Sequence, residues 1–104
     1  MTSHLDPYTF VLDADHNVVQ HDNDDEWWLW YLDMSNRRVG YTEIAGGQMS
    51  VSTVFTAMDI TPDRGRMFET KVFGGDHDQE TFRCATWDEA VRQHHEVVTM
   101  VSNA

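Results

Sequence analysis

The sequence predicts an α+β fold: a mainly antiparallel sheet of four to six strands with two helices, the C-terminal helix packed on one face of the sheet. Residues 48–60 alternate apolar and polar side chains with the period of two that is typical of a strand. Residues 87–101 instead place their apolar side chains along one helical stripe. Several further strand-like segments are separated by turn sequences at hairpin spacing. These patterns favour antiparallel strands and helices within one domain, residues 1–104.

The N-terminal part of the chain predicts two short strands followed by a helix. Residues 8–12 are rich in β-branched and aromatic side chains, and residues 18–21 are expected to return beside them as a second strand. Asn23, with Glu26 three residues later, has the pattern of a capping box and predicts a helix that ends near Ser35. Acidic residues in its first turn also suit the positive end of the helix dipole.

The remainder of the chain predicts four strands and the second helix. Glycine pairs and a proline-containing turn separate the strands, which we expect at residues 38–45, 48–60, 66–73 and 80–85. Thr86 and Glu89 form a second capping box, so we expect the last helix to begin at Trp87 and to end near Val101.

The predicted core joins one face of the strands to one stripe of the C-terminal helix. The stripe consists of Trp87, Ala90, Val91, His94, Val97, Val98 and Val101. The residues expected in the core are Met49, Val51, Phe55, Phe68, Val72, Phe82, Trp87, Val91 and Val98.

The composition argues against several classes of function. The chain carries 18 acidic and 7 basic residues, a formal charge of −11, so its surface repels nucleic acid and anionic membranes. No segment approaches the roughly 20 consecutive apolar residues of a membrane span, and the N-terminus lacks the basic and apolar regions of a signal peptide. We therefore expect a cytoplasmic protein with no direct nucleic-acid partner and no membrane partner. The single cysteine, Cys84, excludes an internal disulfide and is expected to be a buried, inert thiol.

The predicted helix after Asn23 holds more apolar surface than one sheet can cover. Its apolar side chains span roughly 200° of the helix circumference, whereas a helix on a sheet needs a stripe of about 100°. One side is expected to be core: Trp28, Tyr31 and Leu32. The other side is predicted to be an interaction surface, because exposed apolar patches mark interfaces and tryptophan is a favoured anchor: Trp27, Trp30 and Met34. A homodimer contact, a site for another partner or ligand, and cover by a loop or by the second strand all remain open.

His94 is the notable polar residue of the predicted core, because it lies among valines in the middle of the helical stripe. A histidine there is expected to be buried, neutral and structural, with its pKa lowered by burial. The alternative is a pocket around His94 in a small enzyme or ligand-binding protein, which would need a neighbouring carboxylate or nucleophile. The sequence identifies no such neighbour and no catalytic residue.

No metal or cofactor site is expected from the sequence. Residues 13–24 place acids or amides at several positions of a calcium loop, but they lack its central glycine and its final glutamate. A hairpin turn followed by a capped helix explains this stretch better. The histidines and aspartates at positions 16, 21, 22, 77 and 78 lack the spacing of a zinc site.

Three stretches of the chain carry a resemblance to a known group of proteins. They are VSTVF at residues 51–55, FETKVFGG at residues 68–75 and TWDEAVRQH at residues 86–94. With them the chain resembles small acidic proteins of actinobacteriophages and actinobacteria, in which Lys71 falls at a variable place. The chain departs from the group's pattern in its aromatic helix, where Trp27 and Trp30 are additional. The resemblance implies a bacteriophage gene product that acts in the host cytoplasm, and it implies no particular activity.

The function expected from these observations is that of a small non-enzymatic interaction protein, a homodimer that docks on a host or phage protein through its aromatic patch. Acidity suits docking on a basic partner. One alternative is an enzyme or ligand-binding protein with a pocket around His94. Another is an acidic mimic of DNA that occupies a nucleic-acid-binding protein, which would need its acids on one face. An exposed tryptophan patch favours the first function, and a concave pocket holding His94 beside a polar partner favours the second.

Overall fold

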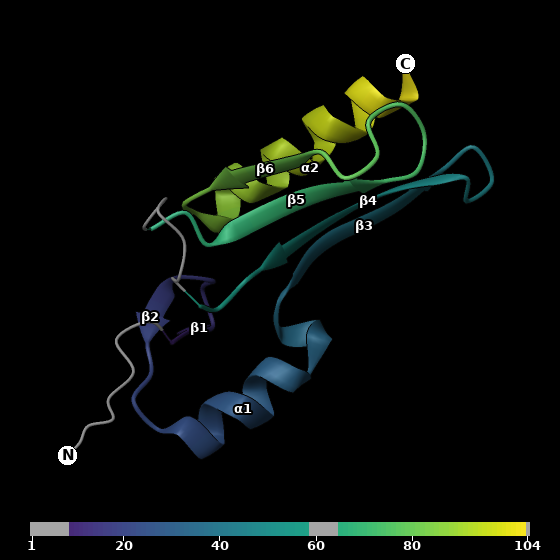
Figure 1. The fold of residues 1–104 in the computed structure, drawn as a ribbon. Coiled ribbons are helices and arrows are strands. Elements are labelled where there is room, and N and C mark those ends of the chain that lie inside the picture. The colour runs from purple at the N-terminus through teal and green to yellow at the C-terminus, as the bar shows by residue number, and fades with distance from the viewer. Residues whose placement is uncertain (1–8, 59–64, 104) are drawn as a thin grey trace.

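The computed structural model describes residues 9–58 and 65–103 (Figure 1). Its elements follow the predicted order closely: β1 (Phe10–Leu12), β2 (Val18–Gln20), α1 (Asp24–Leu32), the 3-10 turn η1 (Met34–Asn36), β3 (Arg38–Ile44), β4 (Met49–Phe55), β5 (Phe68–Phe73), β6 (Thr81–Cys84) and α2 (Trp87–Ser102). The α+β class is confirmed, with a four-stranded and a two-stranded antiparallel sheet. No helix within the described ranges is long and apolar enough to cross a membrane.

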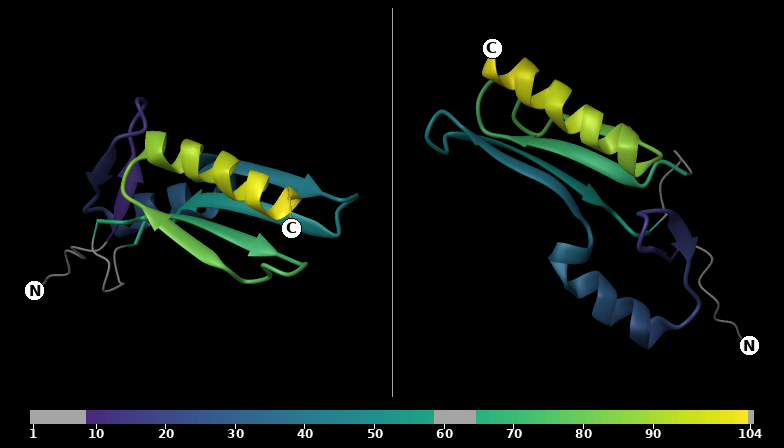
Figure 2. Two further views of the ribbon diagram at one scale, coloured as in Figure 1. Left: turned by 90° about the horizontal axis from the view of Figure 1, so that it is seen from above. Right: turned by 180° about the vertical axis from the view of Figure 1, so that it is seen from behind.

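Strands β3, β4, β5 and β6 form the larger sheet in chain order, each antiparallel to the next. Such a meander needs only short connections, and the Gly46 and Gly47 turn between β3 and β4 adopts the positive φ that glycine tolerates. The register shifts between Arg38 and Gly40, where β3 has a bulge. Helix α2 lies across one face of this sheet, as predicted (Figure 2).

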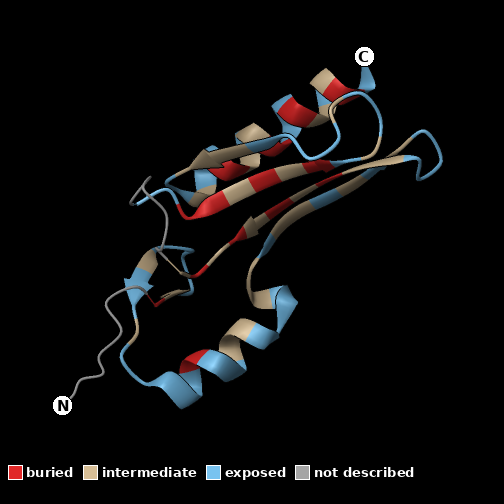
Figure 3. Ribbon diagram, viewed as in Figure 1, coloured by how far each residue is buried: buried red, intermediate tan, exposed pale blue. Residues whose placement is uncertain are grey.

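The side-chain alternation of β4 and β5 explains where the core lies. Val51, Thr53 and Phe55 on β4 are buried, as are Phe68, Thr70 and Val72 on β5, while the residues between them are less buried (Figure 3). From α2 the buried residues are Ala90, His94, Val97 and Val101, which confirms the predicted stripe. The other residues expected in the core are partly buried: Met49, Phe82, Trp87, Val91 and Val98.

Two predicted elements end earlier than expected. The strand predicted for residues 48–60 ends at Phe55, and Ala57 has a φ of 66°, which breaks the extended backbone. The helix predicted to reach Ser35 ends at Leu32, because Asp33 is extended and its Oδ1 accepts hydrogen bonds from the Ser35 N–H and hydroxyl. The part of that strand beyond Met58 lies outside the described residues.

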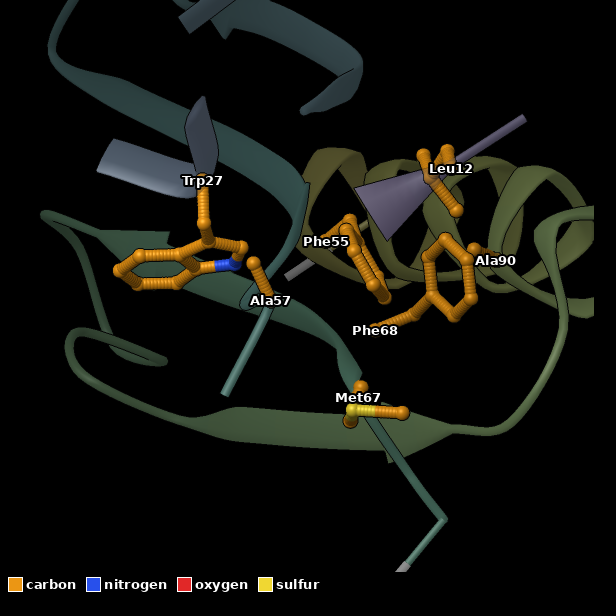
Figure 4. Packing of buried hydrophobic residues seen from close by; sticks show 7 residues of the cluster. All are labelled: Leu12, Trp27, Phe55, Ala57, Met67, Phe68 and Ala90. Atoms are coloured by element: carbon orange, nitrogen blue, oxygen red, sulfur yellow. The ribbon is translucent and has the colours of Figure 1, made fainter. Parts of the chain in front are cut away.

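The β1–β2 hairpin packs at one end of the large sheet. Its turn is held by Asp13, whose Oδ1 accepts from the backbone N–H groups of Asp15 and Asn17 at 2.9 Å each. This is the hairpin turn expected for that stretch. A cluster of buried residues connects the hairpin, α1, the sheet and α2 (Figure 4): Leu12, Trp27, Phe55, Ala57, Met67, Phe68 and Ala90.

Candidate functional site

Helix α1 begins in an acidic segment and is capped by one side chain. The Asn23 Oδ1 accepts a hydrogen bond from the Glu26 N–H at 3.0 Å, which satisfies one of the free donors of the first turn. The predicted return contact from Glu26 is replaced, because its carboxylate lies 3.2 Å from Nε2 of His21. Asp24, Asp25 and Glu26 therefore occupy the positive end of the helix, where acids are stabilising.

The inner face of α1 is held by polar contacts as well as by packing. Trp27 is 2% exposed, and its indole Nε1–H donates to the carbonyl oxygen of Phe10 on β1 at 2.9 Å. Trp30 is partly buried, and its ring centroid lies 6.0 Å from that of Phe55 in an edge-on contact. Tyr31 stacks on Trp27 with ring centroids 4.8 Å apart. These three residues fill about 100° of the helix surface, the stripe expected for one packed face.

The opposite side of α1 is apolar and exposed. Leu29 is 75% exposed, Leu32 is 71% exposed and Trp28 is 51% exposed. We call these three residues the α1 outer face. Trp28 is nevertheless held in place, since its ring contacts Trp27 and Tyr31 edge-on at centroid distances of 5.0 and 5.6 Å. Figures 1 and 3 show α1 set off from the four-stranded sheet, with much of its ribbon coloured as exposed in Figure 3, and it contacts chiefly β1 and η1.

The prediction that α1 has surplus apolar surface is right, and Tyr31 lies on the packed side as predicted, but the tryptophans and Leu32 were assigned to the wrong sides. Trp27 and Trp30, predicted to face outward, lie on the inner side, and Trp28 and Leu32, predicted to be core, are exposed. Met34 is exposed as predicted, at 37%. The two sides are almost equally apolar, so hydrophobicity alone could not choose between them. The choice depends on a hydrogen-bond acceptor on β1 for a buried indole, a contact that the α1 sequence cannot reveal.

His94 is buried, as predicted, and it lies between two threonine hydroxyls. Its Nε2 is 2.9 Å from the Thr42 Oγ1 on β3, and its Nδ1 is 2.8 Å from the Thr53 Oγ1 on β4. Gly40 lies beneath the ring: a Cβ at that position would be 3.1 Å from three of its atoms. Burial, and to a lesser extent the nearby His95, lower the pKa of His94 below its ordinary value. The imidazole is therefore neutral at neutral pH.

The direction of each hydrogen bond around His94 can be assigned by starting from the backbone carbonyl of Arg83, at the other end of the network. The Arg83 carbonyl can only accept, so the Gln93 amide places its Nε2 there at 3.5 Å and its Oε1 toward Thr70. The Thr70 hydroxyl donates to that Oε1 at 3.1 Å, which leaves Thr70 to accept from Thr53 at 2.7 Å. Having donated its only proton, Thr53 accepts from the His94 ring. Neutral His94 therefore carries its proton on Nδ1.

This network favours a structural role for His94 over a catalytic one. His94 and Thr42 line a hollow of about 220 Å³, whose walls are completed by Val91, His95 and residues 39–41 of β3. Nδ1 is engaged with Thr53 and Nε2 with Thr42, so a substrate would have to displace the Thr42 hydroxyl to reach the ring directly. The Thr42 hydroxyl contacts Nε2 as a nucleophile would contact its base, but Nδ1 contacts the Thr53 hydroxyl and not the carboxylate that would orient a catalytic histidine.

The other histidines considered as metal ligands have separate partners. His16 stacks on Trp87 with ring centroids 3.7 Å apart, and His77 Nδ1 is 2.7 Å from the Glu80 carboxylate. Among residues 9–58 and 65–103, no three acids, histidines or cysteines come together as a metal site would require.

No family model, curated protein or solved structure was found to match the chain. Sequence reasoning overlooked Leu29, the most exposed large apolar residue of the described chain, although its place between two tryptophans of an apolar helix was a usable signal. It also overlooked a group of arginines on the sheet face opposite α2.

Proposed function

We propose that this chain is a small non-enzymatic interaction protein that associates as a homodimer through the α1 outer face. The proposal rests on one observation: Trp28, Leu29 and Leu32 form a contiguous exposed apolar surface on a helix whose other face is already packed. Contiguous exposed patches of large apolar side chains usually mark the sites at which proteins bind partners. In keeping with the resemblance of the sequence to actinobacteriophage proteins, we place its action in the cytoplasm of an actinobacterial host.

A second copy of the chain is the occupant best suited to this face. A two-fold contact uses the same patch on both partners, and homodimers are the commonest oligomers. Antiparallel packing of two α1 helices would keep the acidic first turns at opposite ends of the contact, where the acids of Asp24 and Asp25 do not meet their copies. A contact between parallel helices would bring those acids together and is disfavoured for that reason.

The size of the α1 outer face sets the expected strength of the dimer. An aromatic side chain buries roughly 150–250 Å², whereas a standard interface buries about 800 Å² on each partner. One tryptophan and two leucines therefore supply only part of a stable interface. We expect a weak dimer that dissociates in the micromolar range.

Sedimentation over a range of protein concentrations tests the proposal. The wild-type chain should pass from monomer to dimer, and a variant with Trp28→Ser and Leu29→Ser should remain a folded monomer. Phe73→Ser is the matched control, because Phe73 is a half-exposed apolar residue at the end of β5, outside α1. This control should dimerise like the wild type.

A wild-type chain that stays monomeric at every concentration would overturn the homodimer. The α1 outer face would then be assigned to a host protein. In that event, capture from host lysate should retain a partner on the wild type and lose it on the Trp28→Ser and Leu29→Ser variant.

A further inference from the structure

The face of the large sheet opposite α2 carries a cavity of about 300 Å³. Its floor is formed by Val54, Glu69 and Arg83, which are register partners across β4, β5 and β6. Side chains of Tyr31 and Met58 also line it. This volume is at the lower end of the range of about 300–1,000 Å³ for small-molecule sites, and its walls combine apolar and charged groups as such sites do.

Basic residues are concentrated in this cavity. The chain has 7 lysines and arginines in all, and three of them, Arg37, Arg66 and Arg83, line it. They come from three different parts of the fold: the segment after η1, the segment before β5, and β6 itself. In a chain of formal charge −11, this clustering produces a local positive region that the overall charge conceals.

Among the described residues one acid lines the cavity, and it is paired with an arginine. The Glu69 Oε2 accepts from Arg83 Nε at 3.2 Å and from Arg83 Nη2 at 2.9 Å. This ion pair leaves Arg37 and Arg66 as the charges that an incoming ligand would meet.

Arg37 is a partly buried cation whose partners in the structure are neutral. Its Nε donates to the Tyr31 carbonyl at 2.9 Å, its Nη1 donates to the Phe55 carbonyl at 3.0 Å, and its Nη2 contacts the Met34 sulfur at 3.4 Å. The guanidinium also lies over the Tyr31 ring, 4.0 Å from the centroid. Burial lowers the pKa of Arg37, which means that its charge lacks full compensation. The described residues engage three of its five N–H donors, and the other two could meet a ligand.

Arg66 supplies a second charge in the lining of the cavity. It is exposed and makes no hydrogen bond or ion pair with any residue in the described part of the chain. A fixed guanidinium on one wall and an adaptable one on another suit a group with two acceptor oxygens.

We propose that this arginine cavity binds a small carboxylate with an apolar body. Arg37 and Arg66 hold the carboxylate, and Tyr31, Val54 and Met58 contact the apolar part. Glu69 keeps Arg83 out of the contact and limits the affinity. None of these residues belongs to the α1 outer face, so the proposal stands or falls separately from the homodimer.

Titration of the full chain with sodium benzoate at constant ionic strength, followed by amide NMR shifts, tests this site. Benzoate should produce saturable shifts at Val54 and Met58. Arg66→Gln should weaken binding roughly tenfold, the loss expected for one charge-assisted contact. Arg92→Gln is the matched control: it removes the same charge from an exposed position on α2, across the sheet from the cavity, and should leave the affinity within about twofold. Glu69→Gln should strengthen binding, because it releases Arg83.

Three results would overturn the proposal. The first is the absence of saturable shifts with benzoate. The second is an equal effect of Arg66→Gln and Arg92→Gln, which would show that benzoate responds to the net charge of the chain and not to this cavity. The third is acetate binding as tightly as benzoate, which would show that an apolar body contributes nothing to binding.

Discussion

The hydrogen bonds around His94 form a chain in which each donor has a single acceptor. The Thr42 hydroxyl donates to Nε2, and the Nδ1–H donates to Thr53, whose own proton continues toward Thr70. Protonation of Nε2 would force Thr42 to reverse its hydroxyl in a partly buried site. The network and the burial therefore favour the same neutral form of the ring.

The first prediction concerns the state of this ring. Nitrogen NMR of His94 at neutral pH should give a protonated Nδ1 and an unprotonated Nε2. On acid titration the ring should remain neutral below the ordinary histidine pKa of about 6.5. A proton on Nε2, or an imidazolium at neutral pH, would contradict the direction assigned to the network.

The same shift makes stability depend on pH. Because the pKa of His94 is lower in the folded chain than in the unfolded chain, the unfolded chain binds the proton more readily. The contribution of His94 is complete above about pH 6.5 and is lost as the pH falls through the folded-state pKa. Urea unfolding of the wild type and of His94→Gln, compared above and below this range, isolates the effect, since glutamine cannot titrate. On acidification, the free energy of unfolding should fall more for the wild type than for His94→Gln.

Sequence reasoning went only part of the way for this residue. Helical spacing was enough to place His94 on the buried stripe of α2. Its partners Thr42 and Thr53 are 52 and 41 residues away in the chain, and only the register of β3 and β4 brings them to the ring. The requirement for Gly40 beneath the ring arises from the same register.

At the scale of elements, α1 is a helix whose buried face could not be predicted from the spacing of its apolar residues. In α2 the apolar residues lie on one side and the charged residues on the other, so the buried face could be predicted. In α1 nearly every side chain after Glu26 is apolar, and the wheel offers two stripes of similar character. The indole of Trp27 and the carbonyl of Phe10 decide between them.

The third prediction separates the two faces of α1 by their contributions to stability. Trp27→Ala should lower the free energy of unfolding by roughly 3–5 kcal/mol, because it removes a buried ring and leaves the Phe10 carbonyl without its donor. Leu29→Ala should change it by no more than about 0.5 kcal/mol, as expected for an exposed site. Urea unfolding at a concentration where the chain is monomeric measures both. Equal losses would show that the two faces are packed alike.

At the scale of the whole molecule, the charge is unevenly placed. Acids occupy the start of α1, the start of α2 and the hairpin turn, while three arginines meet in one cavity opposite α2. The net charge follows directly from the sequence, but the cavity could not be predicted from it. Arg37, Arg66 and Arg83 become neighbours only when the sheet forms, and the acidity of the chain suggested the opposite kind of ligand.

The last prediction follows from the net charge. Two copies of a chain with a charge of −11 repel each other, so added salt should strengthen a dimer held by apolar contacts. Between about 0.01 M and about 1 M sodium chloride the screening length falls from about 30 Å to about 3 Å, which removes most of that repulsion. Sedimentation at neutral pH should therefore give a dissociation constant that decreases across this range. The Trp28→Ser and Leu29→Ser variant should stay monomeric throughout, which excludes general salting-out. Docking on a basic host protein would respond in the opposite way, because salt weakens attraction between opposite charges. A dimer that dissociates on addition of salt would mean that charged contacts, and not the α1 outer face, hold the two copies together.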